Sequence, residues 1–451
     1  MKEKIKLSRS LSLTAVVVYG MAFMALTTVF STYGIAAQIS HGMVAGSYVL
    51  AMIVMMFTAY SYGQMAKAFP VSGSAYTYAQ KSIHPFVGFL VGWAILMDYL
   101  FIPMVNFLLF GIFFSAAIPE VPSYVWILVL IVVVTIVNVR GVKLGARVNM
   151  LVIGFSLLFL AVFCILSIKS ITQGTGTGGF VNFESFFNPD ESFTYIVAGA
   201  ALLCFSFLGF DAVSTFSEEV KNPEKNIPRA IFLVTFIGGL CFIVVSYVAH
   251  NVWPDYMSFI NPDSAANEII LLIGGNALQA AFLVITALVV FGSASASQAS
   301  AARVLYAMGR DGQLPNGFFG KLHEKTRTRV NNILLIGVLS LSALFLSLTF
   351  VASFINFGAL LAFTAVNLSV IALYFVKRKQ RSFKGVICYL LIPLMGASLT
   401  AWLLFNLDGY SKLLGGIWFL GGVVYLYFMT KKSKKQPFLL STEDEIPDSG
   451  T

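Results

Sequence analysis

Long apolar stretches follow one another along the whole chain, and the polar residues collect in short segments between them. A run of roughly 18 apolar residues already suggests a membrane-spanning helix. Runs near or above this length are predicted at about 13–38, 44–66, 86–117, 123–139, 148–168, 194–216, 230–251, 277–306, 331–350, 353–376, 386–406 and 413–430. The pattern predicts an all-α integral membrane protein of about twelve transmembrane helices, with the lipid bilayer as its surroundings.

The composition and the placement of charge agree with this class. Hydrophobic residues make up 58% of the 451 residues and charged residues only 11%, whereas soluble domains carry roughly 25% charged residues. The net charge of +9 does not indicate a nucleic-acid partner, because all of the 29 Lys and Arg except Lys169 and Lys412 fall on one side of the predicted membrane. The positive-inside rule therefore predicts a multi-pass cell-membrane protein with both termini in the cytoplasm.

Two of the predicted spans contain residues that favour a break in the helix. Span one has Thr27 and Thr28 at its centre, where hydroxyl groups can satisfy freed backbone groups. Span six has Gly209 within an apolar run, and glycine permits a break. The two spans stand five apart, which indicates a five-plus-five inverted repeat with a binding site between the repeats. In the alternative interpretation, these small residues only ease helix packing.

Two carboxylates fall inside predicted spans. Asp211 follows Gly209 by two residues, and Asp98 lies in span three. An ionisable group at this depth is costly, so it usually faces the protein interior and marks a substrate or ion path. A broken helix beside a buried acid is suited to binding a cation near the middle of the bilayer.

Several runs of sequence resemble a known family in the family's own order. They are the sixth-span runs 207–211, 218–223 and 227–230, the run 69–78 after span two, the start of span three at 88–93, and the exit of span eight at 303–315. Together they resemble the amino acid–polyamine–organocation transporters. Within that superfamily, the runs 78–83 and 97–106 are most similar to those of the bacterial putrescine importers.

The resemblance implies a LeuT-like fold and secondary active transport by a permease. The expected organisation is a cytoplasmic N-terminus at 1–12, a transmembrane transporter domain at 13–430 and a cytoplasmic tail at 431–451. Repeat one would occupy about 13–168, repeat two about 194–376, and two extra helices about 386–430. The resemblance also implies that Asp98, Tyr99 and Asp211 belong to the substrate region.

Putrescine has an ammonium group at each end of a flexible chain, so it needs two acceptor sites joined by an apolar or aromatic sleeve. Asp211 and Asp98 are the candidates for the two ends. The candidates for the sleeve, with cation–π contacts of about 0.5–2 kcal/mol each, are Tyr99, Phe205, Phe207 and Phe210. Core or lipid packing is the alternative role for the phenylalanines, and a structural polar pair with Asn106 or a backbone group is the alternative for Asp98. Because Tyr99 directly follows Asp98, the two side chains point in different directions on a regular helix.

Span one gives an indirect indication of the substrate. Amino acid transporters of the superfamily usually have glycines at this break, where exposed N–H groups hold the substrate carboxylate, and close approach favours glycine. Here the corresponding run 24–30 has no glycine, and Thr27 and Thr28 are the candidate contacts. A substrate without a carboxylate therefore fits better, although threonine hydroxyls can also donate hydrogen bonds.

Energy coupling has two candidate mechanisms. Either Asp211 or Asp98 can carry a proton in a symport mechanism, whereas Ser297 and its neighbouring serines would contribute to a sodium site. Each positive charge that moves inward gains roughly 2.3 kcal/mol per 100 mV of inside-negative potential.

The rival functions are an amino acid permease of the same fold, a membrane-embedded enzyme and a channel. The four histidines show no metal-ligand spacing, and neither a nucleophile motif nor a selectivity filter is visible. The sequence therefore predicts no cofactor and no metal site. It favours an importer of putrescine or another polyamine, with an amino acid permease as the alternative.

Overall fold

The computed structural model describes residues 9, 11–70, 74–141, 146–179, 181–217, 219–310, 314–321 and 328–432. Within these ranges the chain is helical, with one isolated β-bridge between Leu11 and Val220. The α-helices are α1 Leu13–Met24, α2 Thr28–Ile39, α3 Val44–Ala68, α4 Ser74–Ser82, α5 Pro85–Ala117, α6 Ser123–Val139, α7 Ala146–Thr172, α8 Phe193–Leu203, α9 Pro223–Val252, α10 Ala265–Arg310, α11 Asn316–Phe319, α12 Val330–Ser340, α13 Leu348–Val370, α14 Phe383–Val386, α15 Ile392–Phe405 and α16 Gly409–Lys432.

Short helices of other types extend several of these spans. The 3-10 helices are η1 Cys204–Phe207, η2 Asp211–Phe216, η3 Pro262–Ser264 and η4 Leu341–Leu344, and the π-helices are η5 Ile371–Lys377 and η6 Ile387–Leu391. In the part of the chain that the structure describes, nine helical segments are long and apolar enough to cross a membrane, and α1 with α2 forms a tenth, bent candidate. Two shorter apolar helices cover 123–139 and 330–344. The protein is thus a multi-pass, all-helical membrane protein, and the count of twelve spans stays a prediction.

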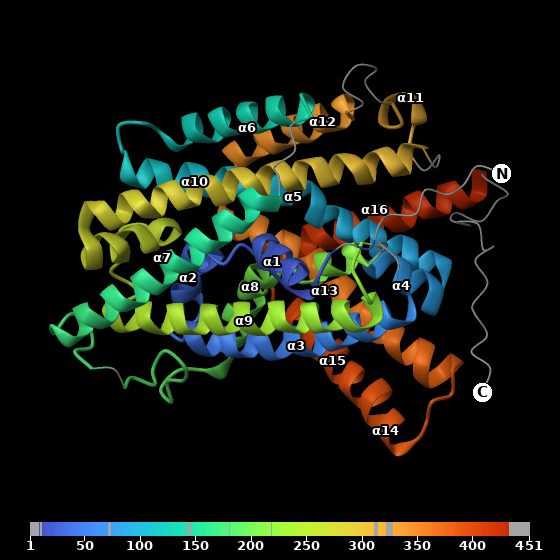
Figure 1. Ribbon diagram of the computed structural model, residues 1–451, viewed down its shortest axis with the longest axis horizontal. Helices are drawn as coiled ribbons and strands as arrows, with labels where there is room; N and C mark the ends of the chain where they lie inside the picture. The colour runs from blue at the N-terminus through green and yellow to red at the C-terminus, as the bar shows by residue number, and fades with distance from the viewer. Residues whose placement is uncertain are drawn as a thin grey trace.

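The long helices lie side by side in an elongated bundle, and the broken spans are at its centre (Figure 1). In the most apolar window of the segment Phe193–Phe216, 72% of residues are buried, against 17% for Gly409–Phe428. The sixth predicted span is therefore enclosed by other helices, while α16 lies at the periphery. This arrangement places any site on the broken spans in the interior of the protein.

Two boundaries differ from the sequence-based expectation. The seventh predicted span begins at Pro223 instead of about 230, because proline is favoured in the first turn of a helix and Asn222 takes a left-handed conformation with φ 49° before it. The eighth begins earlier as well, because Asn261 caps η3 and α10 starts at Ala265. Gly275, with φ 61°, then bends α10 near the predicted start of the span.

Candidate functional site at two helix breaks

The first break separates α1 from α2, whose axes are bent by 45°. Ala25 takes a left-handed conformation with φ 46°, and Thr27, only 8% exposed, follows in the break. The Thr28 hydroxyl donates to the carbonyl of Met24 at 3.4 Å and also contacts the Ala25 carbonyl. The Thr28 hydroxyl therefore bonds to backbone carbonyls at the interruption of the helix, as expected for a threonine at this position.

The second break lies between η1 and η2, across residues 208–210. Gly209 has φ +109°, a conformation that L-residues with a side chain rarely adopt. A Cβ atom on Gly209 would lie 2.9 Å from the Phe23 carbonyl carbon and 3.0 Å from the Met24 nitrogen. Gly209 is therefore needed for two reasons, the backbone turn and the close approach of the two breaks to each other.

Asp211 begins η2 directly after this break and is partly buried. The Gly209 N–H donates to Asp211 Oδ1 at 3.3 Å. Asp98 and Tyr99 of α5 both interact electrostatically with Asp211, so the structure brings together the two candidate carboxylates. Asp98 Oδ1 is buried and has no hydrogen-bond partner among the described residues.

Asn106 is not the partner of Asp98. Its amide donates to the Ile102 carbonyl at 2.9 Å and to Ser293 Oγ at 3.1 Å. The structure therefore does not support the structural pair that was the alternative role for Asp98. Pro103 also interrupts α5 here, and because proline has no N–H, the carbonyl of Tyr99 loses its helical donor.

Two tyrosines near Asp211 were missed by the sequence analysis. Tyr62 of α3 and Tyr78 of α4 are fully buried, interact electrostatically with Asp211, and have ring centroids 6.0 Å apart. The side chain of Ser74 interacts with the Tyr62 hydroxyl, and that of Ser214 interacts with the Tyr78 hydroxyl. Tyr78 could have been identified from the sequence, because it lies in a run that resembles the family. Tyr62 could not, because a tyrosine inside an apolar span is normally interpreted as a packing residue.

The candidate aromatic residues separate into different environments. Phe210 packs against Tyr62 with centroids 5.6 Å apart, so it belongs to the aromatic group around Asp211. Phe207 instead packs against Phe242 of α9 at 5.4 Å, as the core-packing alternative expects. Phe205 is partly buried against the main core, and Tyr99 packs beside a small cluster that includes Ala301.

Ser297 lies in α10, where its hydroxyl donates to the Ser293 carbonyl at 2.7 Å within the same helix. No hydrogen bond links it to span one among the described residues. The structure therefore does not bring Ser297 together with the two carboxylates through any direct contact.

A chain of hydroxyl groups joins the two broken spans and was also missed. The hydroxyl oxygen of Tyr48 on α3 lies 3.4 Å from Thr32 Oγ1 on α2 and 3.1 Å from Ser206 Oγ on η1. All three side chains are buried. Such a bridge depends on tertiary packing between segments 158 residues apart, and the sequence pattern alone gives no signal for it.

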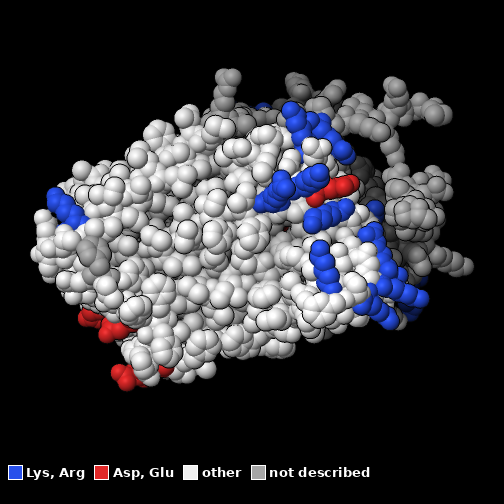
Figure 2. Space-filling model, turned by 60° about the horizontal axis from the view of Figure 1, so that its bottom comes forward, with Lys and Arg blue, Asp and Glu red and all other residues white. Residues whose placement is uncertain are grey.

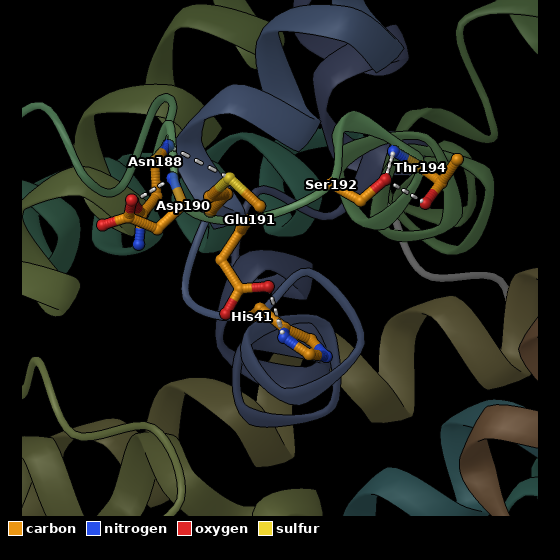
Figure 3. A network of polar contacts seen from close by, with 7 residues as sticks. His41, Asn188, Asp190, Glu191, Ser192 and Thr194 are labelled. Carbon is orange, nitrogen blue, oxygen red and sulfur yellow. Dashed lines mark hydrogen bonds and ion pairs between the residues drawn. The ribbon is translucent and has the colours of Figure 1, made fainter.

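At the other end of these half-helices, an ion pair connects the segments that precede α8 and follow α2. His41 Nδ1 lies 3.0 Å from Glu191 Oε2, with the two side chains about one-third exposed (Figure 3). The His41 ring stacks on Tyr195 with centroids 3.7 Å apart. Ser192, which caps α8, directly follows Glu191, so this contact ties together the ends of both half-helices.

Charged residues are divided between the ends of the molecule. Most of the Lys and Arg on the face in Figure 2 form a band at one end, with acidic atoms among them, most acidic atoms lie near the other end together with some basic ones, and the surface between is largely uncharged. This separation follows the pattern of the predicted topology.

The chain has relatives among known transporters. The amino acid permease family model matches residues 16–407. The chain is 41% identical over 429 residues to the low-affinity putrescine importer PlaP of Escherichia coli strain K12, covering 95% of each protein. It is 27% identical over 453 residues to the methylthioribose transporter of Bacillus subtilis, covering 95% of each protein. It is also 26% identical over 463 residues to the branched-chain amino acid permease BcaP of Lactococcus lactis subsp. cremoris, covering 92% of this chain and 93% of the relative. Because these relatives differ in substrate, the residues of the site must indicate which one is transported.

Proposed function

The chain belongs to the amino acid permease family, and from that premise we propose that it imports putrescine or a closely related polyamine across the cell membrane. The observation that supports the proposal is the electrostatic interaction of Asp98 with Asp211 in the interior. Among the described residues, no Lys, Arg or His forms an ion pair with either carboxylate. Since burying an unpaired charge is expensive, the two groups need protons or a cationic ligand, and a diamine supplies two cationic ends.

The state of the second break favours a diamine over an amino acid. The Gly209 N–H of this break already donates to the Asp211 carboxylate. A substrate carboxylate would have to approach this negative charge, which disfavours it. The first break contains Thr27 and Thr28 but no glycine, whose exposed N–H groups could hold a substrate carboxylate. The first break therefore also favours a diamine over an amino acid. The relative that imports putrescine is 41% identical to this chain, which adds support.

The site would bind one ammonium at Asp211 and the other near Asp98. Phe210, Tyr62 and Tyr78 would cover the methylene chain and add cation–π contacts. Phe205 and Tyr99 would border the same space, while Phe207 would support it from the core side. An amino acid permease with the same fold is the second candidate, because a branched-chain amino acid permease is 26% identical to this chain.

The proposed architecture is LeuT-like, with twelve spans and both termini in the cytoplasm. Broken spans at the first position of each proposed repeat, 13–168 and 194–376, support the inverted repeat. The band of Lys and Arg at one end supports a cytoplasmic position for that end (Figure 2).

Membrane potential would drive uptake. A dication would gain about 4.6 kcal/mol per 100 mV, twice the value for a single charge. A proton carried by Asp211 or Asp98 would add to this driving force, and a sodium ion held near Ser297 is the alternative.

The test is uptake of labelled putrescine by purified protein in liposomes with an inside-negative potential. Saturable uptake that diamines compete for, and amino acids do not, is expected. Asp211→Asn should lower uptake at least about tenfold, because a hydrogen bond to a charged group contributes roughly 1.5–3 kcal/mol. Glu120→Gln, at an exposed position away from the site, is the matched control and should transport normally. Normal uptake by Asp211→Asn would overturn the site assignment, and uptake of amino acids alone would overturn the substrate.

A further inference from the structure

A groove on the membrane-facing side of the bundle lies outside the proposed substrate site. Its volume is about 400 Å³, and it is lined at successive turns of α3 from Val49 to Tyr60, with Ile243 of α9 and Ile392 of α15. The α3 residues repeat every three or four positions and therefore share one face of the helix. This face is about 17 Å long at a rise of 1.5 Å per residue. Its lining is apolar except for the Tyr60 hydroxyl.

The groove continues towards a pair of stacked tyrosines. One helical turn beyond Tyr60, the Gln64 carbonyl accepts a hydrogen bond of 3.1 Å from the Tyr374 hydroxyl. The Tyr374 ring stacks on Tyr389 with centroids 4.5 Å apart and an interplanar angle of 8°. Because Tyr60 also interacts with Cys388 and Tyr389, the aromatic pair adjoins the Tyr60 end of the groove. Tyr374 is buried, and Tyr389 is the partly exposed member of the pair.

A cationic turn lies between the two tyrosines of this pair in the sequence. It contains Lys377, Arg378, Lys379, Arg381 and Lys384, and the segment 377–384 has no acidic residue. All five are exposed, and none forms an ion pair with a described residue.

Aromatic residues hold the two guanidinium groups of this turn. The Arg378 guanidinium lies over the Tyr374 ring at 5.0 Å, and that of Arg381 lies over Phe375 at 5.3 Å. Phe383 in the same turn is 85% exposed, as is expected of a side chain that inserts at a membrane interface. The turn is flanked by the π-helices η5 and η6. π-Helices are rare in proteins, and those that occur are often found at functional sites.

From this juxtaposition we infer that an anionic phospholipid binds along α3, α13 and α15. Its phosphate would lie at Arg378 and Arg381, its glycerol region beside the partly exposed Tyr389, and one acyl chain in the groove that begins at Tyr60. The unpaired positive charge selects an anionic head group, since basic clusters directly cytoplasmic of a transmembrane helix attract anionic lipids. The continuity with an apolar groove selects a lipid rather than a free anion.

The test measures lipids retained by the purified protein in native mass spectrometry. The protein is incubated with equal amounts of phosphatidylglycerol and phosphatidylcholine that have the same acyl chains. We expect the wild type to retain phosphatidylglycerol severalfold more. The double variant Arg378→Gln with Arg381→Gln should lose this preference, whereas Arg140→Gln, an exposed cation at the end of α6, should keep it.

A second variant tests the acyl-chain part of the site. Ile53 lines the groove and is 46% exposed, so Ile53→Trp should fill the groove without disturbing the core. We expect it to reduce retention of phosphatidylglycerol. Leu158→Trp, at a 59% exposed position on α7, is the control and should have no effect.

Three results would overturn the inference. They are equal retention of the two lipids by the wild type, unchanged retention in both site variants, and equal losses in the control variants. Retention of glycerol phosphate that Ile53→Trp does not alter would indicate a free-anion site instead. Because lipid retention is measured without transport, failure here is independent of the proposed substrate.

Discussion

Replacing Gly209 by alanine tests whether the two helix breaks are built against each other. The residue has φ +109°, and holding an L-residue with a side chain in such a sparsely populated region costs about 1–3 kcal/mol. The added methyl group would also meet the backbone of Phe23 and Met24 at 2.9–3.0 Å, and overpacking of this kind costs about 1–3 kcal/mol. The sum, about 2–6 kcal/mol, is large beside a typical folding stability of about 5–15 kcal/mol.

Gly209→Ala is therefore expected to lower the thermal denaturation temperature in detergent and to abolish putrescine uptake in liposomes. Gly154→Ala is the matched control, because Gly154 lies on the exposed face of α7 and a Cβ atom there would have no neighbour within 4 Å. In a helix interior this change is favourable by about 1 kcal/mol. Unchanged denaturation and uptake in Gly209→Ala would refute the reasoning that this position requires glycine.

Three further substitutions test other parts of the proposed mechanism. Tyr48→Phe removes the hydroxyl bridge between the broken spans and leaves the buried Ser206 hydroxyl without its partner, while Thr32 keeps its bond to the Thr28 carbonyl; this is expected to cost about 1–3 kcal/mol of stability and to slow uptake, whereas Tyr427→Phe at an exposed position should have no effect. Glu191→Gln changes the contact of Glu191 with His41, which is about one-third exposed and contributes about 0.2–1 kcal/mol as an ion pair when His41 is protonated, so hydrogen exchange should increase around residues 40–46 and 186–192 while steady-state uptake persists; unchanged exchange would argue against this contact. Ser297→Ala should leave uptake unchanged if a proton is the coupling ion, whereas loss of a sodium-stimulated component would assign Ser297 to a sodium site.

The positions of the helices could be predicted because hydropathy alone decides them. The span predicted at 44–66 is α3 at Val44–Ala68, and the one at 86–117 is α5 at Pro85–Ala117. The prediction was less accurate where local backbone chemistry extends a helix beyond its apolar run. Pro223 starts α9 in a polar segment, and the Asn261 cap with η3 starts α10 before the apolar run.

The candidate site could be predicted in part, because a carboxylate in an apolar span stands out whatever surrounds it. Asp98 and Asp211 became candidates in this way, and their role in the site stays a prediction. Tyr62 and Tyr78 were not, since a tyrosine in a membrane helix has the same local pattern whether it faces lipid, the core or a ligand. Contacts between distant segments, such as Tyr48 with Ser206, depend on how the helices pack and have no signature in a single sequence.

Under the proposed function, Asp211 would connect the substrate to the second helix break. Its carboxylate accepts the Gly209 N–H, and Gly209 lies against the backbone of Phe23 and Met24 in the other break. An ammonium group or a proton that arrives at Asp211 withdraws charge from this hydrogen bond, so it changes the stability of the second break and of its contact with the first. A ligand shifts a conformational equilibrium only through different affinities for the two states. Under the proposed function, the interaction of the ligand with the Asp211 carboxylate would supply this difference in affinity. Asp211→Asn is therefore expected to impair transport even though the neutral amide preserves the shape of the site.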